Sequence, residues 1–139
     1  MLTESPLADE LEQALLRIED EALRHYALAL LCRLLGRREE ALLELFAALD
    51  VAPDDPAVLY QLGDCWRALR RYREAAEAYG RSALAGGPWS GGADFNMYFC
   101  LHQMGEEGRE LLRARPDLQA LVPELTRWVL EGRLPPTGG

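Results

Sequence analysis

The segment 22–87 resembles itself when it is shifted by 34 residues. The shift aligns seven identical pairs, namely Tyr26 with Tyr60, Leu28 with Leu62, Arg33 with Arg67, Leu35 with Leu69, Arg37 with Arg71, Glu40 with Glu74 and Ala41 with Ala75. A self-match at this interval is typical of helix–turn–helix repeats, in which each unit buries its apolar face against the next. The sequence therefore predicts an all-α fold built from stacked helix pairs.

The length and composition agree with one helical domain. The chain has 139 residues, of which 49% are hydrophobic, and a domain of this size buries roughly 70% of the surface of its unfolded chain. Leu, Ala, Glu and Arg are abundant and β-branched residues are few, which favours helix over strand. We expect a single domain over residues 1–131.

Helix start and stop signals divide this domain into units. Pro6 suits the first turn of a leading helix, with Ser5 as its cap, and we expect this helix to span residues 6–20. Gly36 ends the first helix of repeat one, and Pro56, preceded by Asp55 as a cap, starts repeat two. The predicted units are repeat one (22–55), repeat two (56–88), a degenerate repeat three (91–115), a capping segment (117–131) and a flexible tail (132–139).

With position 1 at residues 22 and 56, the two repeats resemble the tetratricopeptide repeat (TPR). That family has large residues at positions 4, 7, 11 and 24, small ones at 8, 20 and 27, and Pro at 32. Repeat one supplies His25, Leu28, Ala29, Cys32, Ala41, Leu45, Ala48 and Pro53. Repeat two supplies Leu59, Leu62, Gly63, Trp66, Ala75, Tyr79, Ser82 and Gly87, with Pro88 one place late. The small residues let helices approach and the large ones fill the gaps between them. The resemblance implies a short right-handed solenoid of about three helix pairs.

The third unit departs from this pattern. Aligning Gly105 with Gly36 requires a one-residue insertion, and it places Tyr98 and Glu110 where the family has Ala. The stretch Gly86–Gly92 before this unit is predicted to be a flexible loop. No strand precedes that stretch and no GK[ST] follows it, so we do not expect it to bind phosphate. A degenerate last repeat followed by a capping helix would cover the apolar end of a short solenoid.

A narrower resemblance is to the class II chaperones of bacterial type III secretion. It rests on the small acidic chain with a leading helix and three repeat units, on residues 62–84 and on the aromatic segment 95–105. Those chaperones hold pore-forming translocator proteins in the cytosol before export. The resemblance implies a client protein, but ordinary repeat proteins match most of the same positions.

In a TPR fold the concave groove is lined by positions 2, 5, 9, 12 and 13 of each first helix. The resemblance therefore implies a partner-binding groove lined by Tyr26, Leu30, Arg33, Tyr60, Asp64, Arg67, Phe95, Phe99 and His102. Aromatic residues and Arg are common anchors of protein interfaces. The alternative is that Tyr26 and Leu30 pack under the leading helix. A Lys/Asn clamp for a terminal carboxylate is not expected, because its positions hold Tyr26 and Leu30.

Charge and hydropathy narrow the choice of partners. The formal net charge is −8, which disfavours nucleic acid and anionic membrane surfaces. No run of about 18 apolar residues predicts a membrane span, and the first residues lack the pattern of an export signal. We expect a cytoplasmic protein whose partner is a protein or peptide client with apolar segments.

The residues that could carry chemistry form no recognisable motif. Cys32, Cys65 and Cys100 lie in apolar runs without CxxC spacing, as expected of buried free thiols. His25 and His102 lack metal-ligand spacing, so we expect neither a metal nor a cofactor. The segment 134–138 (LPPTG) matches the LPxTG sorting pattern, and it is either an added tag or a coincidence in a Pro/Gly-rich tail.

The sequence thus predicts a non-enzymatic adaptor or chaperone that binds a client peptide in its groove. One alternative is a subunit that self-associates, for example as a homodimer. The other is an enzyme without a recognisable motif.

Overall fold

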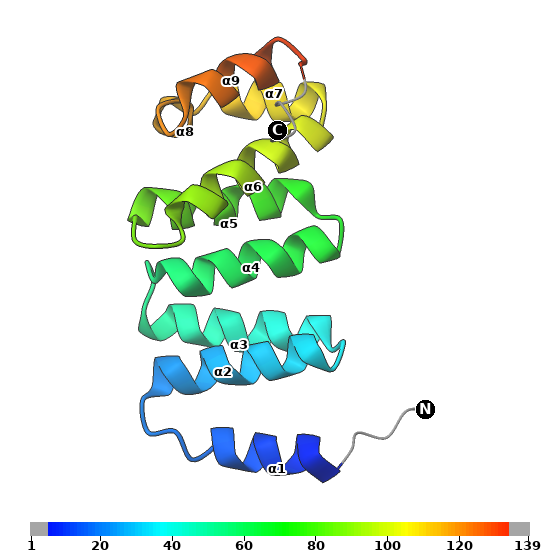
Figure 1. Cartoon of the computed structure of the whole chain (residues 1–139), viewed down its shortest axis with the longest axis vertical. Coiled ribbons are helices and arrows are strands. Elements are labelled where there is room, and N and C mark those ends of the chain that lie inside the picture. The colour runs from blue at the N-terminus through cyan, green and yellow to red at the C-terminus, as the bar shows by residue number, and fades with distance from the viewer. Residues whose placement is uncertain (1–5, 134–139) are drawn as a thin grey trace.

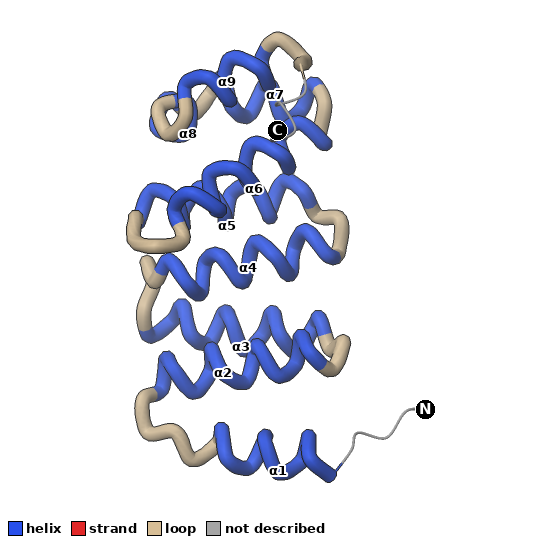
Figure 2. Tube along the Cα trace, viewed as in Figure 1, coloured by secondary structure: helices blue, strands red, loops and turns tan. Residues whose placement is uncertain are grey.

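The computed structural model of the chain describes residues 6–133, which form nine α-helices and no strand. The helices are α1 (Pro6–Leu15), α2 (Glu21–Leu34), α3 (Arg38–Val51), α4 (Pro56–Ala68), α5 (Tyr72–Ala85), α6 (Ser90–Gln103), α7 (Glu106–Arg113), α8 (Pro116–Gln119) and α9 (Pro123–Leu130). They follow one another along the long axis of the molecule (Figure 1), and the turns that join them alternate between its two sides (Figure 2). The predicted all-helical fold with adjacent paired helices is confirmed.

The pairs α2–α3 and α4–α5 have nearly the same local structure. Helices α3 and α5 begin and end 34 residues apart. Asp20 and Asp55 cap α2 and α4 in the same extended conformation, and each side chain accepts hydrogen bonds from backbone N–H groups of the first turn. The shared caps explain why the two helix pairs start in the same way.

Small residues lie where the paired helices meet. Ala41 and Ala75 have no exposed surface. A Cβ atom added to Gly63 would lie 2.7 Å from the ring of Tyr79, so the absent side chain lets this ring lie against α4. Ser82 donates a hydrogen bond to the Pro56 carbonyl oxygen at 2.8 Å and thereby ties α5 to the start of α4. The chain therefore uses its small positions for close helix contact.

The third helix pair corrects the prediction of a loop before it. Helix α6 begins at Ser90, inside the Gly-rich stretch that we expected to be a loop. Tyr98, aligned with a small position, is fully buried, and Glu110 is exposed. The close contact is instead made by Gly108, where an added Cβ would lie 1.9 Å from the Leu101 carbonyl oxygen. The third pair thus crosses at a different position from the first two.

Helices α8 and α9 cover the C-terminal end of the stack (Figure 1). The Tyr98 hydroxyl donates to the Leu118 carbonyl oxygen at 2.7 Å, accepts from the Val122 amide at 3.1 Å and lies 2.8 Å from Thr126 Oγ1. Leu118 and Val129 are buried in the same core as Tyr98. One side chain of α6 therefore anchors the whole capping segment.

Some predicted boundaries are wrong by several residues. The leading helix ends at Leu15 rather than near residue 20, where Asp20 has an extended conformation and caps α2. Helix α3 continues to Val51, which leaves residues 52–55 to connect it to α4. The proposed Ser5 cap, the LPPTG pattern and most of the predicted flexible tail lie outside the described residues.

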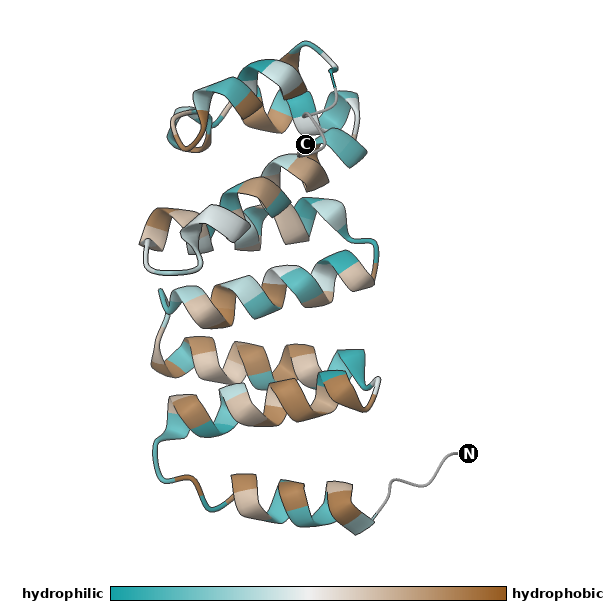
Figure 3. Ribbon diagram, viewed as in Figure 1, coloured by the Kyte–Doolittle hydropathy of each residue, from teal (hydrophilic) through white to brown (hydrophobic). Residues whose placement is uncertain are grey.

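Hydropathy varies along the stack. The ribbon is largely hydrophobic over α2 and α3 and more hydrophilic over α7 (Figure 3). Within residues 6–133, no helix is long and apolar enough to cross a membrane.

Candidate functional site

Helices α2, α4 and α6 are neighbours on one side of the stack. Arg33 of α2 donates a hydrogen bond to Gln61 of α4, and Asn96 of α6 donates one to the Tyr60 hydroxyl at 3.0 Å. These contacts connect the first helices of the three pairs. We call the surface that these helices form the α2–α4–α6 face.

Asp64 lies at the centre of a polar network on this face. It accepts a hydrogen bond from the Tyr79 hydroxyl, and its side chain is only 15% exposed. Arg33 Nη1 and Arg67 Nη2 each lie 3.6 Å from one of its carboxylate oxygens. Burial, together with the hydrogen bond to Asp64, raises the pKa of Tyr79, so its hydroxyl keeps its proton. The predicted inner-face residues Arg33, Asp64 and Arg67 therefore lie together.

Tyr60 belongs to an aromatic cluster. Its ring meets Tyr79 edge-on with centroids 5.5 Å apart, and it lies 5.2 Å from the ring of Trp89. An added Cβ at Gly92 would lie 3.2 Å from the Tyr60 hydroxyl oxygen, so the glycine lets α6 approach. Trp89 was not among the predicted site residues. The aromatic residue within the Gly-rich stretch was the signal that could have identified it.

Tyr26 and Leu30 lie on α2 in different surroundings. Tyr26 is half-buried; burial is the main cause of its raised pKa, and its hydroxyl hydrogen-bonds to Gln61 of α4. Tyr26 therefore packs toward α4. Leu30 lines a shallow surface depression with Arg33 and Leu34. Leu34 is 84% exposed, which makes this end of α2 an open apolar surface.

On α6 the three predicted residues differ in accessibility. Phe95 is 50% exposed, and Phe99 is also exposed. His102 is half-buried, and its Nδ1 atom is enclosed without a hydrogen-bond partner within residues 6–133. His102 is therefore more enclosed than Phe95 and Phe99, the other two predicted groove residues of α6.

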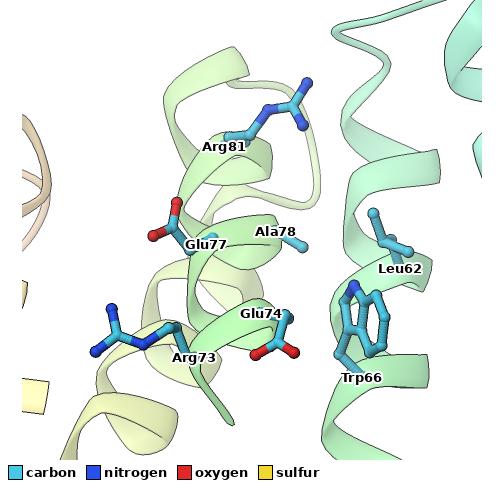
Figure 4. Close-up of a pocket in the computed structure, with 7 residues that line it drawn as sticks. All are labelled: Leu62, Trp66, Arg73, Glu74, Glu77, Ala78 and Arg81. Atoms are coloured by element: carbon cyan, nitrogen blue, oxygen red, sulfur yellow. The ribbon is translucent and has the colours of Figure 1, made fainter. Parts of the chain in front are cut away.

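A shallow pocket lies between α4 and α5 (Figure 4). Leu62 and Trp66 project from α4 toward the residues of α5 that complete the lining, which are Arg73, Glu74, Glu77, Ala78 and Arg81. The Trp66 ring also contacts Phe46, with centroids 6.3 Å apart, and the Arg71 guanidinium lies 5.7 Å from its centroid. From the sequence, Trp66 was expected only to fill space between helices, so this surface was not predicted.

The cysteines and His25 have conventional surroundings. Burial raises the pKa of Cys32 and of Cys100 to about 11, so both thiols are protonated at neutral pH and are weak nucleophiles. His25 Nδ1 lies 2.7 Å from Glu44 Oε2. Within the described part of the chain, no three His, Cys, Asp or Glu residues lie close enough to hold a metal ion.

Comparisons of the chain with family models, with curated proteins and with solved structures gave no match.

Proposed function

We propose that this chain is a non-enzymatic, TPR-type binding module that holds a client peptide on its α2–α4–α6 face. The observation that carries the proposal is the combination of exposed apolar side chains on α2 and α6 with two arginines between them. Aromatic and Arg side chains are the residue types that most often anchor a protein partner. The finer fold proposal, a short right-handed solenoid, is supported by the matched pairs α2–α3 and α4–α5.

The client we propose has an apolar segment. Leu34, Phe95 and Phe99 are exposed, and a partner that covers them would remove apolar area from water. The role that fits is a small adaptor or chaperone that shields such a segment, as the resemblance to secretion chaperones implies. We also propose a cytoplasmic location, where the three free cysteines would stay reduced.

The test is affinity capture from the native cell extract, followed by titration of the captured client. Phe95→Ser and Phe99→Ser should each weaken binding without loss of helicity, because both side chains are already exposed. Leu43→Ser is the matched control, since Leu43 is 68% exposed on α3, outside the α2–α4–α6 face. Equal effects of Phe95→Ser and Leu43→Ser would refute the proposed face.

Self-association is the second candidate. Leu7 and Leu11 are exposed on α1, a helix at the end of the stack with only Ala8 buried. A second copy could cover these residues. The mass of the purified protein separates the candidates, because self-association gives a multiple of the 15.6 kDa chain, whereas a client adds a different mass.

A further inference from the structure

Two guanidinium groups share one carboxylate on the α2–α4–α6 face. Both lie 3.6 Å from Asp64, on opposite carboxylate oxygens. Charge-assisted N–H···O bonds are usually about 2.7–2.9 Å long. Neither arginine therefore forms a close fork with Asp64, and this carboxylate also accepts the Tyr79 hydroxyl.

The two arginines give this part of the α2–α4–α6 face a net positive charge, although the chain as a whole is acidic. Arg33 and Arg67 carry two positive charges against the single charge of Asp64, whereas the whole chain has a net charge of −8. Their side chains are 35% and 41% exposed. Arg33 donates to Gln61, while the Arg67 guanidinium makes no hydrogen bond to any residue from 6 to 133. Several N–H donors of the pair remain available to a ligand.

Apolar residues adjoin this pair on both sides. Leu30 and Leu34 line the same depression as Arg33 on α2. On the other side, Phe99 is exposed on α6. Its neighbour in the sequence, Cys100, is close enough to Arg67 for the charge of the guanidinium to lower the pKa of the thiol. A ligand that fits this arrangement combines a negative group with apolar neighbours.

We propose that the client places the carboxylate of an internal Asp or Glu between Arg33 and Arg67. Guanidinium groups bind carboxylates through paired N–H donors, which selects planar anions over other polar groups. Asp64 then acts as a competing carboxylate, whose negative charge weakens the net attraction of the two arginines for the client. This inference rests on the proposed function, because it assumes that the client lies on the α2–α4–α6 face.

The test is selection from a random 12-residue peptide library whose C-termini are fused to the display protein, so that no terminal carboxylate is presented. The wild type should enrich peptides that combine apolar residues with Asp or Glu. Arg33→Gln and Arg67→Gln should retain the apolar preference and lose the acidic one. Arg127→Gln, on the exposed surface of α9, is the matched control and should select as the wild type does.

Titration of one enriched peptide with an amidated C-terminus measures how much its acidic residue contributes to the affinity. Replacing its acidic residue by the matching amide should weaken binding about tenfold, which is about 1.4 kcal/mol. Asp64→Asn keeps an acceptor for Tyr79 but removes the competing charge, so it should bind the acidic peptide about threefold or more tightly. The same variant should bind the amide peptide as the wild type does.

The outcomes separate this inference from the proposed function. Enrichment of apolar peptides without acidic residues would overturn the inference alone. So would an acidic preference that survives in Arg67→Gln, or weaker acidic binding by Asp64→Asn. Selection that does not differ from that of Phe95→Ser would overturn the proposed face and the inference with it. Circular dichroism of each variant confirms folding, and Arg67→Gln is the informative variant if Arg33→Gln unfolds.

Discussion

Gly36 and Arg70 occupy the same place in successive helix pairs, and both have a left-handed backbone, with φ of 76° and 61°. Each lies between the first and second helix of its pair, 34 residues apart. Glycine adopts this conformation at little cost, whereas a residue with a Cβ atom is strained there. The second turn thus has the geometry of the first without its glycine.

Arg70→Gly should stabilise the protein. Arg70 is exposed, and the described residues give its side chain no ion pair, so the change mainly relieves the backbone. We expect the free energy of unfolding to rise by about 1 kcal/mol. Urea denaturation followed by circular dichroism measures it. Gly36→Ala is the control and should lower the free energy of unfolding by a similar amount. An added Cβ there meets nothing within 4 Å, so the loss would come from backbone strain.

Gly63→Ala should destabilise the second helix pair. The new Cβ atom would lie 2.7 Å from the Tyr79 ring, which is fully buried and cannot move aside freely. Overpacking of this kind costs about 1–3 kcal/mol. Thermal unfolding provides the measurement. Gly91→Ala, in a helical position of α6 with open space around it, should instead be neutral or stabilising by about 0.5 kcal/mol. A loss at both glycines would contradict the steric explanation.

The first two helix pairs were predictable because local signals and spacing agree there. Asp55 and Pro56 mark a helix start, and Ala41 and Ala75 recur at the repeat interval and are both fully buried. Periodicity alone therefore located the helices and their contact residues. Periodicity did not locate the end of the leading helix, which lies at Leu15, five residues before the Asp20 cap of α2.

The third pair was harder to predict because its close contact uses a different residue. Gly108 lies against the backbone of Leu101. The alignment of Gly105 with Gly36 instead places Glu110 at the small contact position. Trp89 and Trp66 were also missed as surface residues, since their exposure depends on how far neighbouring helices are separated. Arg33, Asp64 and Arg67 were found, although their shared network is visible only in three dimensions.

Tyr98→Phe should loosen the capping segment. The change removes the hydroxyl that bonds the Leu118 carbonyl and the Val122 amide. The carbonyl keeps a bond from the Leu121 amide, but the Val122 amide has no other partner within residues 6–133. We expect a loss of about 1–3 kcal/mol. Hydrogen exchange should show faster exchange in α8 and α9 than in α4. Tyr72→Phe is the control, because its hydroxyl makes no hydrogen bond to the described residues, and it should be close to neutral.

Asp94 should make the stability of the protein depend on pH. One of its carboxylate oxygens is enclosed without a hydrogen-bond partner in the part of the chain that the structure describes, and burial raises the pKa of this group. A raised pKa means that the folded state favours the protonated form. The penalty for the charged form is therefore present at neutral pH, shrinks as the pH falls through the raised pKa, and is gone below the usual value of 3.8.

Asp94→Asn removes this charge at every pH and isolates the effect. The variant should unfold at a higher temperature than the wild type at pH 7, and the gap should close as the pH approaches 4. Glu106 and Asp117 have pKa values lowered by neighbouring arginines, so both proteins lose some stability in acid for that separate reason. Only the difference between the two unfolding curves reports on Asp94. A gap that stays constant between pH 7 and pH 4 would mean that the enclosed oxygen carries no unfavourable charge.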